Sequence, residues 1–188
     1  MDNTTSPTET PLPLDSDAII MERISQGDRA ALISLIDNWK QPLLSFFYRS
    51  TGSFADAEEL TFNTFDRLYR AAPRYRPSAK FSSFVFTIAR NLLISRSRTL
   101  QRRPKLVENT PLLEPADPDQ TAISDLRDSL DLALTSLQEK YRTPLLLHVQ
   151  QGLDYEEISK ALNLSHTNVK VRIHRARQML KTKLESLS

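Results

Sequence analysis

The stretch LDYEEISKALNLSHTNVKVRIHRARQML, Leu153 to Leu180, carries the signals of two helices joined by a tight turn. Asp154 is a good N-cap, and two glutamates follow it in the first turn, where the helix dipole favours acidic side chains. The first helix should end near Asn163, and Ser165 can cap the second helix. These signals together predict a helix-turn-helix.

The second helix of this stretch has one apolar stripe and an opposite polar side. Val169, Ile173, Ala176 and Leu180 follow at spacings of four, three and four residues, which is typical of a buried helix face. The side opposite the core would face base edges in the major groove, and it carries Thr167, Asn168, Val171, His174 and Arg175. The flanks would reach phosphates, and they carry Lys170, Arg172 and Arg177. Val171 suits a thymine methyl group, although a stray surface valine is the simpler explanation for that residue alone.

Basic residues are concentrated in two windows that contain no acidic residue. Residues 165–184 hold six Lys/Arg and residues 67–105 hold eleven, whereas the whole chain has 25 basic and 23 acidic residues. The rest of the chain is therefore acidic. A single window of this kind is explained as well by a solvated helix face as by a contact with a polyanion. Two windows favour separate contacts with a polyanion, and nucleic acid is the expected partner.

Composition narrows the class of protein. The chain has 188 residues, of which 39% are hydrophobic and 26% charged, as in ordinary globular proteins. It has no cysteine, which excludes disulfides, thiolate zinc sites and cysteine nucleophiles. No apolar run approaches the roughly 18 residues that span a bilayer, and the N-terminus lacks the pattern of a secretory signal. We therefore expect a cytoplasmic protein without membrane insertion.

The positions of glycine and proline along the chain predict an all-α protein of two small helical domains. The three glycines each fall at a break between segments of helical periodicity, and alternating strand patterns are scarce. Residues 1–14 are rich in Thr and Pro, which predicts a disordered extension. A second proline-rich, acidic segment predicts a flexible linker at residues 101–121. The domains are then expected at residues 15–100 and 122–188.

The motifs of the chain resemble those of a known family. The segment from Tyr155 to Leu180, with its RIHRAR ending, is similar to the region-four helix-turn-helix of bacterial sigma factors of the extracytoplasmic-function class. DAEELTFNTFDRLYRAAPRYR (Asp56–Arg76) resembles region two, and FSSFVFTIARNLL (Phe81–Leu93) resembles its promoter-melting helix. The two motif sets occur in the order of the family, with a linker between them.

The resemblance implies a subunit that binds core RNA polymerase and directs it to promoter DNA. Region four would read the −35 element as duplex, and region two would capture the −10 element as a single strand. The docking surface for the clamp helices of the polymerase β′ subunit would include Asp56, Glu58, Glu59, Phe62 and Asp66. The family is commonly held inactive by an anti-sigma factor. Phe62 stands where the family usually has glutamine. Ser95 stands where the family often has an aspartate shortly after the ARNLL segment.

Region two also has the chemistry that single-strand capture requires. Such a surface combines cations for the backbone with aromatic side chains for unstacked bases, and we assign to it Arg74, Tyr75, Arg76, Lys80, Phe86 and Arg90. Phe81 and Phe84 share an apolar stripe with Ile88 and are expected in the core. Phe86 points away from that stripe, so it either packs against the preceding helices or contacts DNA.

The sequence offers two alternative functions, an enzyme and a stand-alone regulator. An enzyme is disfavoured because the three histidines form no metal-ligand motif and the chain has no glycine-rich phosphate loop, and no cofactor is expected. A stand-alone helix-turn-helix regulator is the stronger alternative. That alternative leaves the basic, aromatic window of the first domain unexplained.

Overall fold

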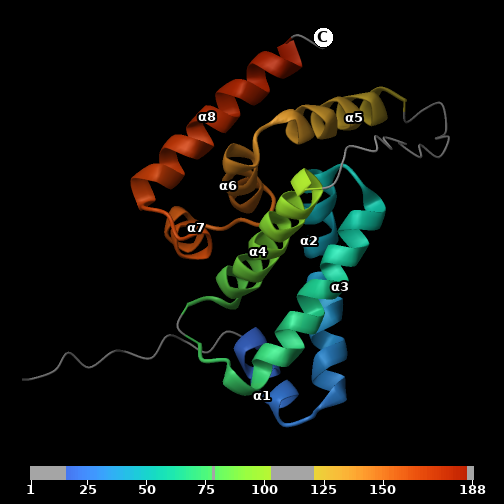
Figure 1. Ribbon diagram of the computed structural model, residues 1–188, viewed down its shortest axis with the longest axis vertical. Helices are drawn as coiled ribbons and strands as arrows, with labels where there is room; N and C mark the ends of the chain where they lie inside the picture. The colour runs from blue at the N-terminus through green and yellow to red at the C-terminus, as the bar shows by residue number, and fades with distance from the viewer. Residues whose placement is uncertain (1–15, 78, 103–120, 186–188) are drawn as a thin grey trace, which may run out of the picture.

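The computed structural model describes residues 16–77, 79–102 and 121–185, which form helices joined by short turns with no strand among them (Figure 1). In chain order the elements are α1 (Ser16–Ser25), α2 (Arg29–Thr51), α3 (Phe54–Ala71), the 3-10 turn η1 (Ala72–Arg74), α4 (Phe81–Arg102), α5 (Thr121–Ser136), α6 (Glu139–Val149), α7 (Tyr155–Leu162) and α8 (His166–Glu185). The all-α prediction is confirmed. The predicted extension at 1–14 and nearly all of the predicted linker lie outside the described residues. Within those residues, no helix is both long and apolar enough to cross a membrane.

Local capping defines the helices of the N-terminal half. The Asp28 carboxylate accepts hydrogen bonds from the backbone N–H groups of Ala30 and Ala31 at 2.9 and 3.2 Å, which caps α2. Helix α2 is followed by its C-cap Gly52, whose φ of +73° lies in the left-handed region that glycine adopts without a Cβ clash. Ser53 then caps α3. The result is a tight antiparallel pair of α2 and α3 (Figure 1).

Aromatic side chains form the centre of this half. Phe46, Phe81 and Phe86 are fully buried, and the rings of Phe46 and Phe86 meet edge-on with 5.2 Å between their centroids. Trp39 packs at 5.6 Å from Phe81, and its indole N–H donates to the Asp17 carboxylate of α1 at 3.0 Å. Such edge-to-face contacts stabilise beyond the area they bury. Helices α1, α2 and α4 are thereby held around one core.

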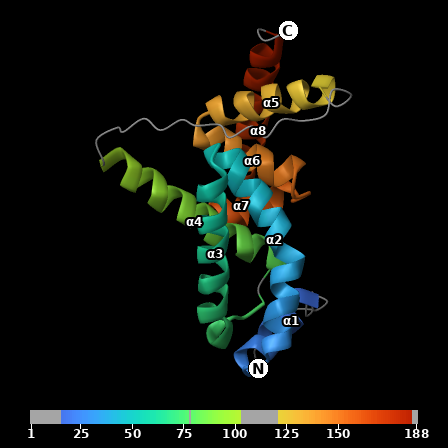
Figure 2. The same ribbon diagram turned by 90° about the vertical axis from the view of Figure 1, so that its right-hand side faces the viewer.

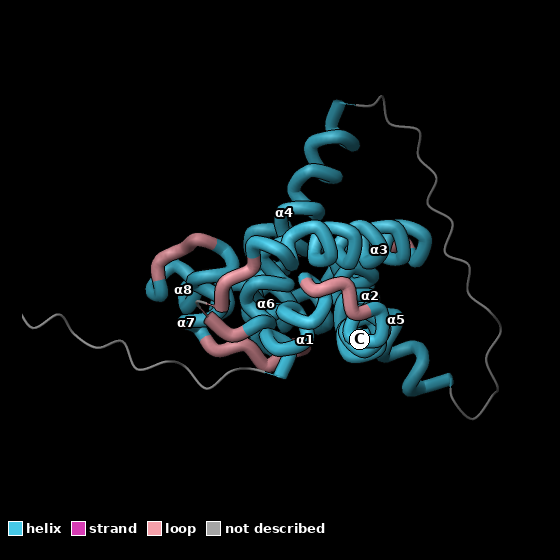
Figure 3. The backbone as a smooth tube through the Cα atoms, turned by 90° about the horizontal axis from the view of Figure 1, so that it is seen from below, coloured by secondary structure: helices cyan, strands magenta, loops and turns pink. Residues whose placement is uncertain are grey.

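The C-terminal half packs against this core. Helix α8 lies against α5, α6 and α7, while α7 contacts α4, and α2 contacts both α5 and α6. The buried apolar residues of the two halves form one continuous cluster. The C-terminal part of α4 projects away from the other helices in Figures 2 and 3. The expected architecture of two small helical units is confirmed, and the units lie directly against each other.

Candidate nucleic-acid interface

The helix-turn-helix of α7 and α8 is built by its caps. The Asp154 carboxylate accepts from the Glu157 N–H at 2.8 Å, and the Glu157 carboxylate accepts from the Asp154 N–H at 2.8 Å, which closes a capping box. Helix α7 ends at Asn163 with a φ of 51°, a conformation that asparagine tolerates better than most residues. The Ser165 hydroxyl accepts from the Asn168 N–H at 3.3 Å. The caps and the turn are where the sequence predicts them.

Helix α8 buries the predicted stripe and exposes the opposite side. Val169, Ile173 and Ala176 are at most 1% exposed, and Leu180 packs half-buried against the same cluster. The side chains expected to face bases are all exposed, and they are Thr167, Asn168, Val171, His174 and Arg175. The geometry thus makes this side available to a ligand. Contacts of these residues with bases stay a prediction.

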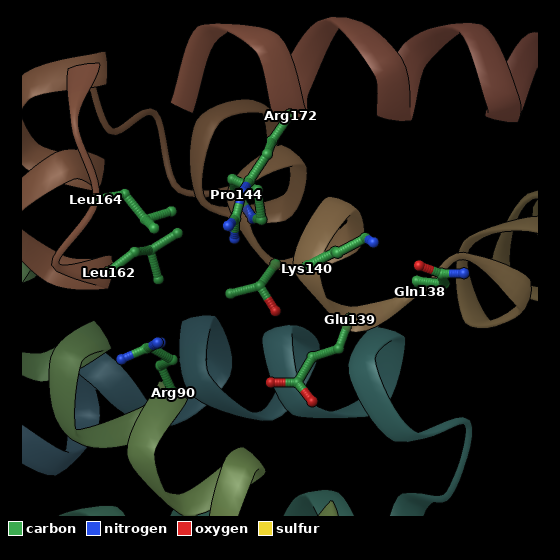
Figure 4. A pocket seen from close by; sticks show the side chains of 9 residues that line it. Arg90, Gln138, Glu139, Lys140, Pro144, Leu162, Leu164 and Arg172 are labelled. Atoms are coloured by element: carbon green, nitrogen blue, oxygen red, sulfur yellow. The ribbon is translucent and has the colours of Figure 1, made fainter. Parts of the chain in front are cut away.

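The three cations on the flanks of α8 differ in their surroundings. Lys170 and Arg177 are exposed. Arg172 is half-buried, its Nε donates to the Asn168 Oδ1 at 2.8 Å, and its side chain lines a cavity that Pro144 of α6 also lines (Figure 4). Lys170 and Arg177 therefore match the predicted phosphate role more closely than Arg172 does in this arrangement.

Tyr141 of α6 is a neighbour of the recognition helix that sequence reasoning missed. A hydrogen bond with the Arg175 side chain lowers the pKa of the Tyr141 phenol, and the charge of Lys140 adds to the effect. The contact orients a side chain expected to meet bases. No local sequence pattern predicts this contact, because Tyr141 and Arg175 are brought together only by the packing of α6 on α8.

Four of the residues assigned to single-strand capture lie just before α4, namely Arg74, Tyr75, Arg76 and Lys80. Arg74 and Arg76 are exposed, and Tyr75 is half-buried, with its ring centroid 4.9 Å from that of Phe84. Lys80 pairs with Glu157 of α7, with 2.9 Å between Nζ and Oε1. The remaining cation, Arg90, lines the cavity shown in Figure 4.

The assignment of Phe86 to a DNA contact is wrong. Phe86 is fully buried, with its ring 5.2 Å from Phe46 and 6.0 Å from Trp39. The physical reason is that α4 packs against α2 and α3 and, in addition, against α7. A helix with neighbours on several sides has more than one buried face, so a residue opposite the first apolar stripe is also in the core.

The predicted polymerase-docking residues lie on α3 in two groups. Glu58 and Phe62 are exposed, Phe62 at 73%. Asp66 is half-exposed and pairs with Arg70 at 3.0 Å. By contrast, the Asp56 carboxylate pairs closely with Arg96 of α4, and the Glu59 carboxylate lies 3.8 Å from the same guanidinium. Two further aromatic residues of α3 are exposed although sequence reasoning did not select them, namely Phe54 and Tyr69.

Comparisons with known proteins match both halves. The family model Sigma-70 region 2 matches residues 35–103, and the model Sigma-70, region 4 matches residues 127–180. The ECF RNA polymerase sigma factor SigE of Mycolicibacterium smegmatis is 34% identical over 82% of this chain and 63% of its own length. The ECF RNA polymerase sigma factor SigW of Bacillus subtilis is 29% identical over 89% of this chain and 96% of its own. The chain belongs to the extracytoplasmic-function class of the sigma-70 family. It thus spans less than two thirds of SigE and nearly all of SigW.

Two solved structures share the fold. CnrH, in complex with the cytosolic domain of CnrY, superposes with a TM-score of 0.72 at 22% identity, covering 93% of this chain and 100% of that one. RpoE of Bartonella quintana, in complex with the anti-sigma factor NepR, gives 0.64 at 20% identity, covering 81% and 95%. In this sigma factor, the region 2 match extends from within α2 through α4, and the region 4 match extends from within α5 to within α8.

Proposed function

We propose that this chain binds core RNA polymerase and directs it to promoters, region 4 holding −35 duplex DNA and region 2 the −10 single strand. Its place of action is then the cytoplasm, and its role is recognition without catalysis. The observation that carries the proposal is the exposed side of α8, which lies opposite a buried stripe and is flanked by cations. A helix of this kind fits the major groove, where side chains distinguish base pairs and cations meet phosphates.

In region 2 the proposal rests on the cluster that surrounds the start of α4. Arg74, Arg76 and Lys80 carry their charges on exposed side chains, next to the half-buried ring of Tyr75. Surfaces that bind single-stranded nucleic acid usually combine two kinds of side chain. Cations lie along the sugar-phosphate backbone of the nucleic acid, and aromatic rings stack with its bases. The ring of Tyr75 packs against the ring of Phe84, with 4.9 Å between their centroids, so Tyr75 is held in place before a base arrives.

Polymerase docking is proposed for the exposed side of α3. Glu58, Phe62 and Asp66 lie within a narrow arc of the helix, since steps of four residues turn it by only about 40°. Tyr69, 55% exposed, continues the same side. An apolar ring bordered by carboxylates suits a partner helix with apolar and basic side chains. Asp56 contributes through its ion pair with Arg96, which joins α3 to α4. By the family resemblance, an anti-sigma factor is a further partner.

The test is transcription from a library of templates with randomised −35 and −10 elements. Core polymerase alone should give no transcripts from the library, whereas polymerase with this protein should select a shared pair of elements. Thymines near −10 should then become reactive to permanganate. The competing function, a stand-alone regulator, predicts a tight sequence-specific footprint by the free protein that polymerase does not change. That result would overturn the proposal.

A further inference from the structure

A cavity of about 320 Å³ lies among α4, α6, α7 and α8 (Figure 4). Arg90 lines it from α4, and Arg172 lines it from α8. The wall between these two side chains is built mainly by the first turns of α6 and by the end of α7. Sites for small molecules in proteins begin at about 300 Å³, so the cavity is large enough to hold a small ligand.

The cavity is lined by more positive than negative charge. Three of its described lining residues are cations, namely Arg90, Lys140 and Arg172, and Glu139 is the one acid among them. Arg90 is half-buried and has no hydrogen bond or ion pair within the described part of the chain. Arg172 is also half-buried, and there it bonds only through its Nε, to Asn168. Two half-buried guanidinium groups that line one cavity repel each other unless an anion lies between them.

Helix α6 adds the partial charge of its first turn to the same cavity. Its N-cap residue is Gln138, which lines the cavity and makes no side-chain capping bond. The first N–H groups of a helix have no partner inside it, and together they carry a partial positive charge. A helix start of this kind is a common site for phosphate groups, and here it lies beside two arginines.

Thr143 of α6 contributes a buried hydroxyl to the lining. Its side chain is only 4% exposed, and its hydroxyl has no hydrogen-bond partner among the described residues. Buried hydroxyl groups in folded proteins are nearly always hydrogen-bonded. A hydroxyl at this place can donate to an anion, as the guanidinium groups and the backbone N–H groups around it can. The donors of three helices thus converge on one cavity.

We infer that this cavity binds a small compound that carries linked phosphate groups, held by Arg90, Arg172 and the first turn of α6. Two guanidinium groups on different helices suit two phosphate groups, because each can bind phosphate through paired N–H donors. The inference goes beyond the proposed function and does not depend on it, since neither polymerase nor promoter DNA takes part. A ligand held in this way contacts both halves, so it should stabilise the folded protein.

The experiment titrates the full chain with inorganic pyrophosphate by isothermal titration calorimetry, in a buffer without divalent cations. Arg90→Gln and Arg172→Gln each remove one positive charge and keep a long polar side chain. Arg98→Gln is the matched control, because Arg98 is an exposed arginine of α4 that does not line the cavity. Thermal unfolding of each variant with and without pyrophosphate gives a second readout, and circular dichroism shows whether the helices are retained.

We expect pyrophosphate to bind the wild type at one site and to raise its unfolding midpoint. Arg90→Gln and Arg172→Gln should each weaken binding by about 10- to 100-fold, the effect of a lost hydrogen bond to a charged group. Arg98→Gln should weaken it by less than about 3-fold, because salt screens an exposed charge outside the site. Without pyrophosphate, Arg90→Gln should melt no lower than the wild type, since it removes the repulsion across the cavity.

Three results would overturn the inference. The first is that pyrophosphate does not bind the wild type. The second is that Arg98→Gln loses as much affinity as Arg90→Gln does, because the ligand would then bind surface charge in general. The third is that a single-stranded oligonucleotide depends on Arg90 and Arg172 while pyrophosphate does not, since the cavity would then serve DNA. None of these results would affect the proposed function, whose test is polymerase-dependent transcription.

Discussion

Phe62 and Phe86 have the same side chain in adjacent helices, yet Phe62 is 73% exposed and Phe86 is fully buried. We expect Phe86→Ala to lower the free energy of unfolding by about 3–5 kcal/mol, because it leaves a cavity among Phe46 and Trp39. Phe62→Ala should change it by less than about 0.5 kcal/mol and weaken binding to core polymerase. Urea unfolding and a polymerase-binding assay measure the two effects. An equal loss of stability in both variants would contradict the difference in burial.

Asp28 connects a single residue to the pH dependence of stability. A hydrogen bond from the Ala31 N–H and then the Arg23 guanidinium lower the pKa of the Asp28 carboxyl below its ordinary 3.8. Because the folded state binds this proton less tightly than the unfolded chain does, the stabilisation is complete above pH 3.8 and is lost as the pH falls through the lowered pKa.

The lowered pKa of Asp28 predicts how the effect of a substitution changes with pH. Asp28→Asn keeps an N-cap acceptor but loses the charge, so it should melt below wild type at neutral pH, and the difference should shrink toward about pH 2. Thermal melts at several pH values measure it. Asp37→Asn, on the exposed side of the same helix, is the control and should show a smaller difference at neutral pH. A difference between Asp28→Asn and wild type that grows on acidification would refute this assignment.

At the scale of one element, substitutions on the exposed side of α8 and substitutions on its flanks should affect −35 binding in different ways. Lys170→Ala or Arg177→Ala should weaken −35 binding about equally across sequences and reduce the salt slope by roughly one unit per lost phosphate contact. His174→Ala or Arg175→Ala should change which −35 sequence is preferred, at about 1–3 kcal/mol per good base contact. Transcription from a randomised −35 library by polymerase carrying each variant measures both.

The structure refines this expectation for Arg172. Because Arg172 is half-buried and its guanidinium donates a hydrogen bond to Asn168, whereas Arg177 is exposed, we expect Arg172→Ala to lower −35 binding less than Arg177→Ala does. If Lys170→Ala or Arg177→Ala altered sequence preference while His174→Ala and Arg175→Ala only lowered total output, the rotation proposed for α8 would be wrong.

At the scale of the whole molecule, one apolar cluster joins the two halves. We therefore expect a single cooperative unfolding transition in spite of the two family domains. Trp39 is the only tryptophan of the chain and lies in region 2, so its fluorescence follows that half, whereas far-ultraviolet circular dichroism follows all helices. The two midpoints should coincide in urea. Separate midpoints would show that the contact between the halves is too weak to couple them.

The sequence alone determined the features that depend on near neighbours in the chain. The caps at Asp154 and Ser165, the turn at Asn163, and the buried stripe of α8 all follow from spacings of a few residues. Such features are predictable because the helix repeat and the unpaired N–H groups of its first turn are local properties. The family and the all-α fold could be predicted for the same reason.

Only the tertiary structure decided what depends on contacts between distant segments. Phe86 is core because α4 has neighbours on several sides, and Arg96 binds the carboxylate of Asp56 because α3 and α4 pack together. The sequence predicts Glu157 only as an acidic residue of the first helical turn, and the structure makes it a member of the capping box and the partner of Lys80 in the other half. Periodicity shows that a helix face is apolar, but it carries no information about which element covers it or which charge it meets there.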